Sequence, residues 1–467
     1  MVAEQDLERS PRRWLALIVC CSALFMTLLD VSVTNVALPS IGRATGASPS
    51  QLQWVVSGYT LAFGLVPVLS GRLGDDHGRR LMFQVGVGSF AATSMLAGLA
   101  PTAAVLIGAR VLQGLAGGLI NPQVSGLVQQ MFGHDERGRA FGALGTTVGV
   151  GTALGPLVGG ALIALGGPHV GWRLVFFVNI PVGIAVFLLA RRLLPDDVRH
   201  GRHRLDIAGA ALLGGSTFCV LFAAVQYDSV RDGRLALLII PAGFLLIVFF
   251  RRERRLTSLE KDPLVDLRLF RVPSYAAGVL FALAYFPAMA GLPLVLAIYY
   301  QDGLGYTALQ SGLGVTAYAI GSAIGAPLAG RFVTRIGRPL LLVGLASFAV
   351  GAIMLAVLAG YSAAALAPAL FLMGAGSGAI ITPNQALSLM RVDPVAGSTA
   401  GGVLQTAQRI GIAIGQAVIG ATFFAAADHG GYAHALRAGV IAALAFLAIA
   451  TAITIADFVQ TRRRIAA

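Results

Sequence analysis

The sequence is poor in charge and in cysteine. Only 12% of its 467 residues are Asp, Glu, Lys or Arg, whereas ordinary soluble proteins carry about 25%. The three cysteines, Cys20, Cys21 and Cys219, all lie in apolar stretches, so they indicate small packing residues and not a disulfide framework. With 56% hydrophobic residues, the chain has too little polar surface for a soluble fold. Secreted, soluble and nucleic-acid-binding proteins are excluded, and a polytopic membrane protein is predicted.

Catalytic chemistry is also missing. The histidines lie in predicted loops or at span ends, apart from His77, which lies in a charged turn. No metal-ligand spacing, phosphate-binding loop or nucleophile with its base is present, so we expect no metal, no cofactor and no enzymatic activity. Without ATP hydrolysis on this chain, the remaining energy source is an ion gradient, worth about 2.3 kcal/mol per proton and 100 mV.

Apolar runs long enough to cross a bilayer, about 20 residues each, recur along the whole chain. Fourteen spans are predicted, of which the run at 236–252 is the weakest because it is short and reaches Arg251. The predicted spans are 14–37, 51–71, 80–99, 103–127, 138–165, 174–193, 205–225, 236–252, 274–300, 308–330, 338–359, 363–389, 397–426 and 435–458.

The basic residues predict the orientation. With the N-terminus in the cytoplasm, 27 of the 34 Lys and Arg residues fall on cytoplasmic segments and five on outer ones. The other two, Arg110 and Arg409, lie inside predicted spans. We therefore expect a multi-pass protein of the cytoplasmic membrane with both termini in the cytoplasm.

A loop motif occurs twice. Gly71-Arg72-Leu73 with Gly78-Arg79 matches Gly330-Arg331-Phe332 with Gly337-Arg338 at an offset of 259 residues. This spacing predicts an all-α fold of two six-helix bundles with pseudo-two-fold symmetry and two inserted helices. The expected domains are residues 1–200, a two-helix insert with its linker at 201–272, and residues 273–467. Repeats of this kind place the binding site between the halves, near the bilayer midplane.

Asp30 is the single acidic residue deep in an apolar span. A carboxyl group inside the bilayer is costly and indicates a function by default. Thr27 and Thr34 share its helical face, so Asp30 has a polar stripe. Burial and a nearby cation act in opposite directions on its affinity for a proton, which makes Asp30 a candidate proton site. The alternative is a structural ion pair that never titrates.

Other polar residues within spans define a candidate substrate cavity. Arg110 is the expected counter-charge of Asp30, although either Arg in the spans could simply bond backbone carbonyls. Tyr285 and Met289 form an i, i+4 stripe that is more often packing than substrate contact. The predicted cavity residues are Thr34, Asn35, Gln113, Asn121, Tyr285, Met289, Gln405 and Arg409.

Two glycine-rich segments carry further predictions. The row of small residues at 151–160 allows another helix to pack closely, with Pro156 as a possible hinge; close packing alone is the alternative. In the loop between the second and third spans, Asp75 can hold a helix N-terminus or an Arg in one conformation, whereas the alternative is a solvated charged turn. The residues concerned are Gly151, Gly155, Pro156, Gly159 and Gly160, and Gly71, Asp75, Gly78, Arg79 and Arg80.

In order along the chain, five motifs resemble those of the major facilitator superfamily, specifically its 14-span drug:proton antiporters of the EmrB/QacA type. The segments are Leu29–Pro39, the gating loop Gly71–Arg80, the proton-coupling motif Arg110–Gly118, the antiporter motif Gly151–Gly160, and Trp172–Gly183. The resemblance implies functional roles for Asp75, Arg79, Gly155 and Pro156. We expect the Asp75 loop to latch the outward-open state and the helix of the antiporter motif to pack closely between the halves. Asp76 departs from the family because a basic residue is usual there, and Thr334 stands in the second copy where the first has Asp75.

The function expected from these features is proton-coupled export of amphipathic, hydrophobic compounds by alternating access. No acidic residue lies deep in the second-half spans, which argues against dicationic substrates. The expected partners are a small hydrophobic substrate, protons and membrane lipids, with no nucleic acid, and the chain is expected to be a monomer. An exporter of lipid or of an endogenous metabolite would share every motif, and a membrane sensor without transport is a further alternative.

Overall fold

The computed structural model describes residues 12–196, 206–230, 233–259 and 261–466, and all regular elements in these ranges are helical. The first bundle comprises α2 (Arg12–Thr45), α3 (Pro49–Leu65), α4 (Pro67–His77), α5 (Arg79–Leu99), α6 (Ala103–Met131), α7 (His134–Phe177) and α8 (Asn179–Leu193). An insert follows, with α9 (Ile207–Val230), η1 (Gly233–Leu238), α10 (Ile239–Ser258) and η2 (Leu267–Arg271). The second bundle comprises α11 (Pro273–Ile298), η3 (Tyr299–Gly303), α12 (Ala308–Gly314), α13 (Thr316–Ile336), α14 (Pro339–Val357), α15 (Ala363–Leu389), η4 (Pro394–Ala396) and α16 (Gly397–Ala466).

Three of the long helical stretches are broken. α3 and α4 meet at a bend of 47°, where Pro67 cannot supply a backbone N–H to the preceding turn. Inside α7 and α16 the chain turns at Gly167 and Gly431, whose φ angles of 71° and 74° lie in the left-handed region that glycine adopts without steric cost. Each of these two elements is therefore a pair of helical rods.

Eleven helices in the described ranges are long and apolar enough to cross a membrane, or twelve if α3 and α4 form one span. The fourteen predicted spans are thus not all reproduced by length and composition. The predicted span 138–165 lies within α7, where only Leu157–Gly167 is a short apolar helix. The span predicted at 236–252 lies largely in α10, whose last turns carry five consecutive charged residues at 251–255 and so leave too short an apolar stretch.

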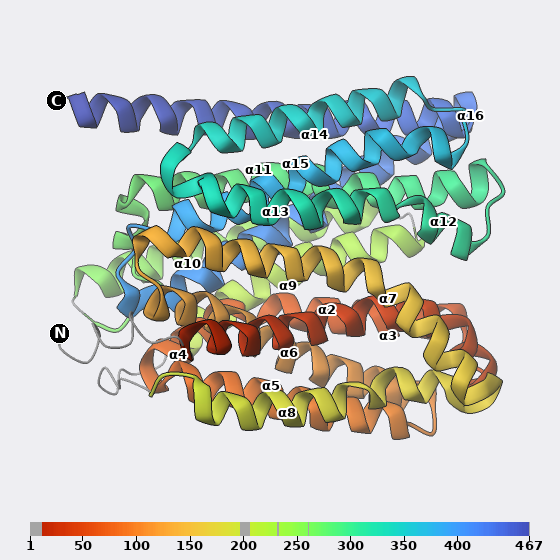
Figure 1. The fold of residues 1–467 in the computed structure, drawn as a ribbon, viewed down its shortest axis with the longest axis horizontal. Helices are drawn as coiled ribbons and strands as arrows, with labels where there is room; N and C mark the ends of the chain where they lie inside the picture. Colours follow the sequence, from red (N-terminus) through yellow and green to blue (C-terminus); the bar gives the residue numbers. More distant parts are fainter. Residues whose placement is uncertain (1–11, 197–205, 231–232, 260, 467) are drawn as a thin grey trace.

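The two bundles lie side by side with the insert helices between them (Figure 1). α7 packs on α13 along one seam between the bundles, and α4 packs on α16 along the other. α9 contacts α10, α3 and α16, so the insert bridges both bundles. These two seams are where the bundles must separate or close in any motion of one against the other.

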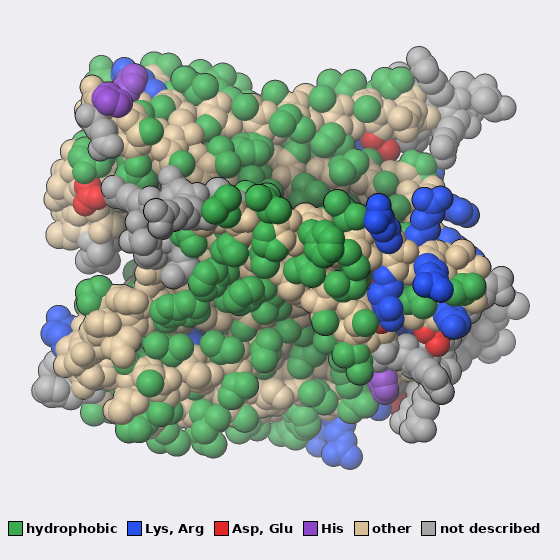
Figure 2. Space-filling model, turned by 180° about the vertical axis from the view of Figure 1, so that it is seen from behind, with side chains coloured by type: hydrophobic (Ala, Val, Ile, Leu, Met, Phe, Trp, Pro, Cys, Tyr) green, Lys and Arg blue, Asp and Glu red, His purple; other side chains and the backbone are tan. Residues whose placement is uncertain are grey.

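The surface matches a membrane-embedded bundle. Hydrophobic side chains cover the middle of the face in Figure 2, and the largest gathering of Lys and Arg lies near one end. The start of α2, the α4–α5 turn, the α13–α14 turn and the end of α16 all lie at one end of the molecule (Figure 1). We call this the basic end. The two copies of the repeated loop are therefore at the same end, as their sequence spacing predicts.

Candidate transport site and the seams between the bundles

Four helices bring polar side chains together around Asp30 of α2. Arg110 of α6 donates through Nη1 to Asp30 Oδ2 at 2.5 Å, while Gln113 Nε2 and Asn179 Nδ2 donate to Oδ1 at 2.9 and 2.8 Å. Ser94 of α5 accepts a further bond of 2.6 Å from Gln113 Nε2. The carboxylate thus has three side-chain donors, one of them charged, which stabilise its negative charge inside the bundle.

Arg110 is the counter-charge that the sequence predicts. Its guanidinium also donates through Nε to the Val55 carbonyl at 3.2 Å and lies 4.3 Å from the centre of the Tyr59 ring. Arg110 and Gln113 reach the same carboxylate because residues three apart share one helical face. Breaking a buried ion pair by removing one partner costs about 3–5 kcal/mol, so this network ties α2 firmly to α6.

The Asp30 side chain is closed off from solvent in this conformation, with 0% of its surface exposed. In this conformation the three donors enclose the carboxylate. Thr34, one turn further along α2, is also buried, and its hydroxyl has no hydrogen-bond partner in the described part of the chain. Asn35 is exposed and outside the network, because one residue along a helix turns the side chain by about 100°. The place of Asn35 in the substrate cavity stays a prediction.

Arg409 of α16 has a different environment from Arg110. Its guanidinium stacks on the Phe63 ring of the first bundle at 4.4 Å, and among the described residues it has no acidic partner. Gln405, one turn earlier, is buried and donates to Ser125 Oγ of α6 at 3.5 Å. Arg409 and Gln405 both reach from the second bundle onto the first, so they lie at the boundary where a substrate site is expected.

The remaining predicted cavity residues divide into two groups. Tyr285 is fully buried in the second bundle against the rings of Phe281 and Phe348, and Met289 packs beside the same core. Both are thus packing residues in this conformation, which is the alternative that the sequence left open. Asn121 of α6 is partly buried, and its side-chain oxygen has no hydrogen-bond partner among the described residues, so it keeps free acceptor capacity.

Asp75 in the α4–α5 loop region joins the two bundles at the basic end. It accepts hydrogen bonds from the backbone N–H groups of Ser398 and Thr399 at 3.1 and 2.7 Å, at the start of α16. Arg79 pairs with the same carboxylate at 2.8 Å and also donates to the Pro394 carbonyl of the second bundle. A carboxylate at a helix N-terminus complements the free N–H groups and the helix dipole. Asp75 is therefore a buried latch and not a solvated turn.

The rest of the loop supports this latch. Gly78 ends α4 with a φ of 112°, which requires glycine, and so turns the chain back toward the bundle for Arg79. Arg80 pairs with Asp196 at 2.5 Å near the end of α8. At Gly71, a Cβ atom would overlap the backbone carbonyl of Ser398, so the two bundles touch backbone to backbone at this point.

Three glycines of the antiporter motif, Gly151, Gly155 and Gly159, pack within the first bundle, whereas Gly160 faces open space. A Cβ on Gly155 would overlap the Ser32 side chain of α2, and Gly151 and Gly159 face neighbouring turns of the same helix. The helix that carries the motif, α7, does pack closely between the halves as predicted, but through glycines that precede this row. The spacing of glycines along one helix predicts that another helix packs closely against it, but does not specify which helix. The side chain of Pro156 lies outside the described part of the structure.

An earlier glycine row on α7 makes the contact between bundles. A Cβ on Gly138 would lie 2.7 Å from the carbonyl oxygen of Gly330 on α13, and one on Gly142 would lie 3.3 Å from Gly330 Cα. Gly149 is the last of these contacts, since its Cβ would lie 3.0 Å from the backbone nitrogen of Ala323. The two bundles are thus in close contact from the basic end to about the middle of α7.

The insert carries a separate charged cluster at the basic end. Arg252 pairs with Asp206 at 2.8 Å, and the backbone N–H of Val265 donates to Glu253 Oε2 at 3.0 Å. Glu253 lies beyond the predicted span 236–252. Burial, together with the neighbouring charge of Asp206, raises the pKa of its carboxyl to about 7. Within the described residues, no group of three or more His, Cys, Asp or Glu side chains is placed to hold a metal ion.

Sequence reasoning missed several partners in these networks. Asn179 and Ser94 complete the Asp30 site, yet both are uncharged residues of distant helices, and nothing in their spacing points to Asp30. Ser398 and Thr399 serve the latch mainly through backbone N–H groups, which any residue supplies. The only available signal was positional, because a predicted span begins at residue 397 on the same side as Asp75.

The geometry can be compared with known proteins. The model of the Major Facilitator Superfamily matches residues 20–416 and 276–466. The chain belongs to the Major Facilitator Superfamily. This superfamily member is 38% identical over 420 residues to the probable actinorhodin transporter of Streptomyces coelicolor, across 88% of this chain and 73% of that protein. It is 35% identical over 436 residues to the puromycin resistance protein pur8 of Streptomyces alboniger, across 90% and 84% of the two chains.

Solved structures show the same fold. The human organic anion transporter MFSD10 superposes with a TM-score of 0.69 at 15% sequence identity, covering 95% of this chain and 100% of that one. The proton:xylose symporter XylE superposes with a TM-score of 0.65 at 15% identity, over 92% and 94% of the chains. At these identities the likeness establishes the fold alone. The chain is therefore a multi-pass membrane transporter of this superfamily, not an enzyme.

Proposed function

We propose that this chain is a proton-coupled antiporter that exports amphipathic, hydrophobic compounds across the cytoplasmic membrane, as a 14-span protein of the EmrB/QacA type. The names of its relatives support the export of antibiotic-like molecules. In this proposal the first rod of α7 and the helix α10 also cross the membrane, although neither meets the length and composition of the other twelve spans. The insert α9–α10 then lies between two six-helix bundles, at residues 201–272.

The basic end is proposed to face the cytoplasm, because the sequence assigns 27 of the 34 Lys and Arg residues to cytoplasmic segments and the largest gathering of described Lys and Arg side chains in Figure 2 lies near this end. The Asp75 latch and the contact between Gly138 and Gly330 close this end. The described conformation then corresponds to the outward-facing state of an alternating-access cycle, in which Asp75 holds the cytoplasmic side shut.

Asp30 is proposed as the proton site, with Arg110 as the residue that controls it. The observation that carries this assignment is the enclosed network, in which one carboxylate has a charged donor and two amide donors. Protonation of Asp30 would remove the charge that holds Arg110 and would free that helix contact. Proton binding and movement of α6 against α2 are thereby linked, because each requires the other.

The charges of Asp30, Arg110 and Arg409 determine which substrate charge the site accepts. Arg110 neutralises Asp30, while Arg409 at the boundary between the bundles has no acidic partner among the described residues. The site therefore carries one net positive charge. Such a site disfavours multiply cationic compounds by repulsion and accepts neutral or singly charged amphipathic ones.

The decisive experiment uses the full chain in proteoliposomes with Asp30→Asn. We expect substrate-driven proton movement to fall at least tenfold, while exchange of labelled substrate for unlabelled substrate continues, since exchange needs no net proton transfer. The matched control is Asp302→Asn, which removes an exposed acid elsewhere. Full coupled transport by Asp30→Asn would show that the Asp30–Arg110 pair is only structural.

A second measurement separates the proposed export of hydrophobic compounds from the alternatives. Efflux of a dye panel from cells that express the chain should stop on addition of an uncoupler. Efflux of labelled lipid or of an endogenous metabolite, without movement of any dye, would assign the chain to that other class of exporter. Binding of a dye without flux would identify a sensor.

A further inference from the structure

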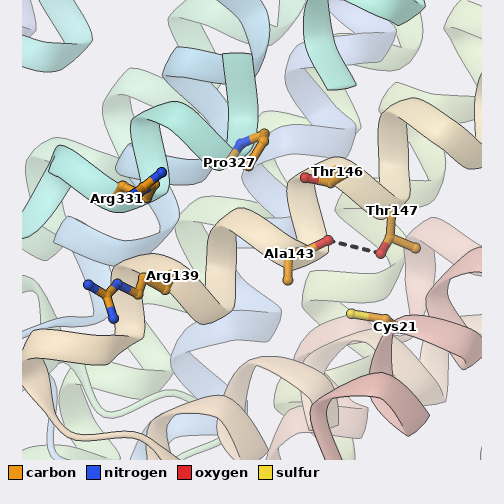
Figure 3. Close-up of a pocket in the computed structure, with 7 residues that line it drawn as sticks. All are labelled: Cys21, Arg139, Ala143, Thr146, Thr147, Pro327 and Arg331. Carbon is orange, nitrogen blue, oxygen red and sulfur yellow. Dashed lines mark hydrogen bonds between the residues drawn. The ribbon is translucent and has the colours of Figure 1, made fainter. Parts of the chain in front are cut away.

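A groove of about 670 Å³ opens on the seam between α7 and α13, next to α2. Figure 3 shows Arg139 of α7 and Arg331 of α13 at one end of this groove, and Thr147 and Cys21 toward the other. The hydroxyl of Thr147 donates to the backbone carbonyl of Ala143 at 2.9 Å, so its hydrogen is used within its own helix. The groove thus has a basic end and a largely apolar body.

The surroundings of the groove face the hydrocarbon of the membrane. Ile18 on α2, Val150 on α7 and Leu328 on α13 expose 59%, 36% and 50% of their surfaces. Exposed aliphatic side chains on all three bordering helices indicate a lipid-facing surface. A groove on such a surface is open to molecules of the bilayer.

The two arginines of the groove are exposed, and neither has a hydrogen bond or an acidic partner within the described ranges. Their neighbour Arg13 is different, because it pairs with Glu136 at 2.8 Å. A second hollow of about 370 Å³ adjoins the groove and includes both arginines together with Asp135 and Glu136. Asp135 is the one acid of this hollow that is not already held by Arg13.

Each arginine lies about one and a half helical turns from the end of its helix at the basic end. Arg139 is the sixth residue of α7, and Arg331 is followed by five residues of α13. At a rise of 1.5 Å per residue, the Cα atoms of both arginines lie about 8 Å inside the ends of their helices. Both arginines therefore lie near the basic end of the helices, where basic pockets between membrane helices bind anionic head groups.

We propose that the groove between α7 and α13 binds one anionic phospholipid, with its phosphate between Arg139 and Arg331 and an acyl chain along Ala143 toward Cys21. The site lies on a seam where the bundles meet through glycine backbones. A lipid bound there contacts both bundles at once and stabilises the conformation in which this seam is closed. The proposal rests on the fold and the groove and is independent of the transported substrate.

The test is native mass spectrometry of the full-length protein released from micelles containing phosphatidylglycerol or phosphatidylcholine. We expect retention of one phosphatidylglycerol, which Arg139→Gln with Arg331→Gln lowers about 25-fold, because each arginine contributes about five-fold, equivalent to about 1 kcal/mol. The matched control is Arg254→Gln with Arg255→Gln, which removes two exposed charges from α10 at the same end and should leave retention unchanged. Inorganic phosphate alone should not bind.

Three results would overturn the proposal. Equal loss of phosphatidylglycerol from the Arg139→Gln/Arg331→Gln variant (the seam variant) and from the control variant would mean that the total positive charge of the protein attracts the lipid. Equal retention of phosphatidylcholine would mean that the arginines do not read the head group. An increased KM for dye efflux in the seam variant, with lipid retention intact, would identify the groove as a substrate path. None of these results depends on the coupling role of Asp30, so the two proposals fail separately.

Discussion

The two copies of the repeated loop occupy equivalent places in the two bundles but hold their seams through different contacts. Gly71 lies against the backbone of Ser398 on one seam, and its counterpart Gly330 lies against the backbone of Gly138 on the other. Both loops turn on a glycine with positive φ, Gly78 at 112° and Gly337 at 67°. The backbone framework of the repeat is therefore retained in both copies.

The side chains of the two copies differ at the positions that carry charge. Asp75 closes one seam as a buried acceptor, whereas Thr334 in the second copy is exposed. Arg72 pairs with Asp76 at 3.1 Å, but the residue four positions after Arg331 is Arg335, so this partner is missing from the second copy. One seam is thus held by a charged latch. The other is held by close backbone contact and by a hydrogen bond from Arg137 to the Met390 carbonyl, with exposed arginines beside it.

The largest effect is expected from removing the latch. Asp75→Ala deletes the acceptor for Ser398 and Thr399 and leaves Arg79 without its counter-charge, which costs about 3–5 kcal/mol for a buried pair. We expect the basic end to open and transport to fall at least tenfold. Labelling of Ser125→Cys by a water-soluble maleimide, in a background without native cysteines, measures the opening because Ser125 is buried between the bundles.

The matched control for the latch is Thr334→Ala, at the same position of the second copy. Its labelling and transport should equal those of the parent chain, because Thr334 is exposed. Equal labelling of the Asp75 and Thr334 variants would show that the two seams are held in the same way.

A smaller effect, of similar size on both seams, is expected from substituting the equivalent glycines of the two loop copies. A Cβ at Gly330 would lie 2.6 Å from the Gly138 carbonyl oxygen, and one at Gly71 would overlap backbone as well, so neither neighbour can yield by a side-chain rotation. Gly71→Ala and Gly330→Ala should each weaken their seam by about 1–3 kcal/mol. Gly160→Ala is the control, since its Cβ would meet open space. Labelling at Ser125→Cys that rises for one seam variant only would mean that the seams open independently.

The sequence was most informative where a residue type is costly in its place. A carboxyl and a guanidinium inside apolar spans predicted the Asp30–Arg110 pair, and the repeated Gly-Arg loop predicted two turns at one end. It was least informative about neighbours. The motif glycines turned out to face α2, and Tyr285 packs in a core, because a helical row does not specify which helix lies against it. The latch on the N-terminus of α16 uses backbone donors that no residue pattern records.

The smallest effect is expected from making the second copy of the loop more like the first. Arg335→Asp supplies Arg331 with an acid four residues away, as Asp76 does for Arg72. Once paired within its own helix, Arg331 no longer serves the lipid phosphate, so retention of phosphatidylglycerol should fall about five-fold, the contribution of one arginine. Arg335→Gln removes the same charge without supplying a partner and should change retention less than two-fold, because Arg335 does not line the groove itself. Equal losses of phosphatidylglycerol in both variants would mean that lipid retention depends on the total positive charge and not on whether Arg331 has an acidic partner. The two loops would then differ in net charge alone.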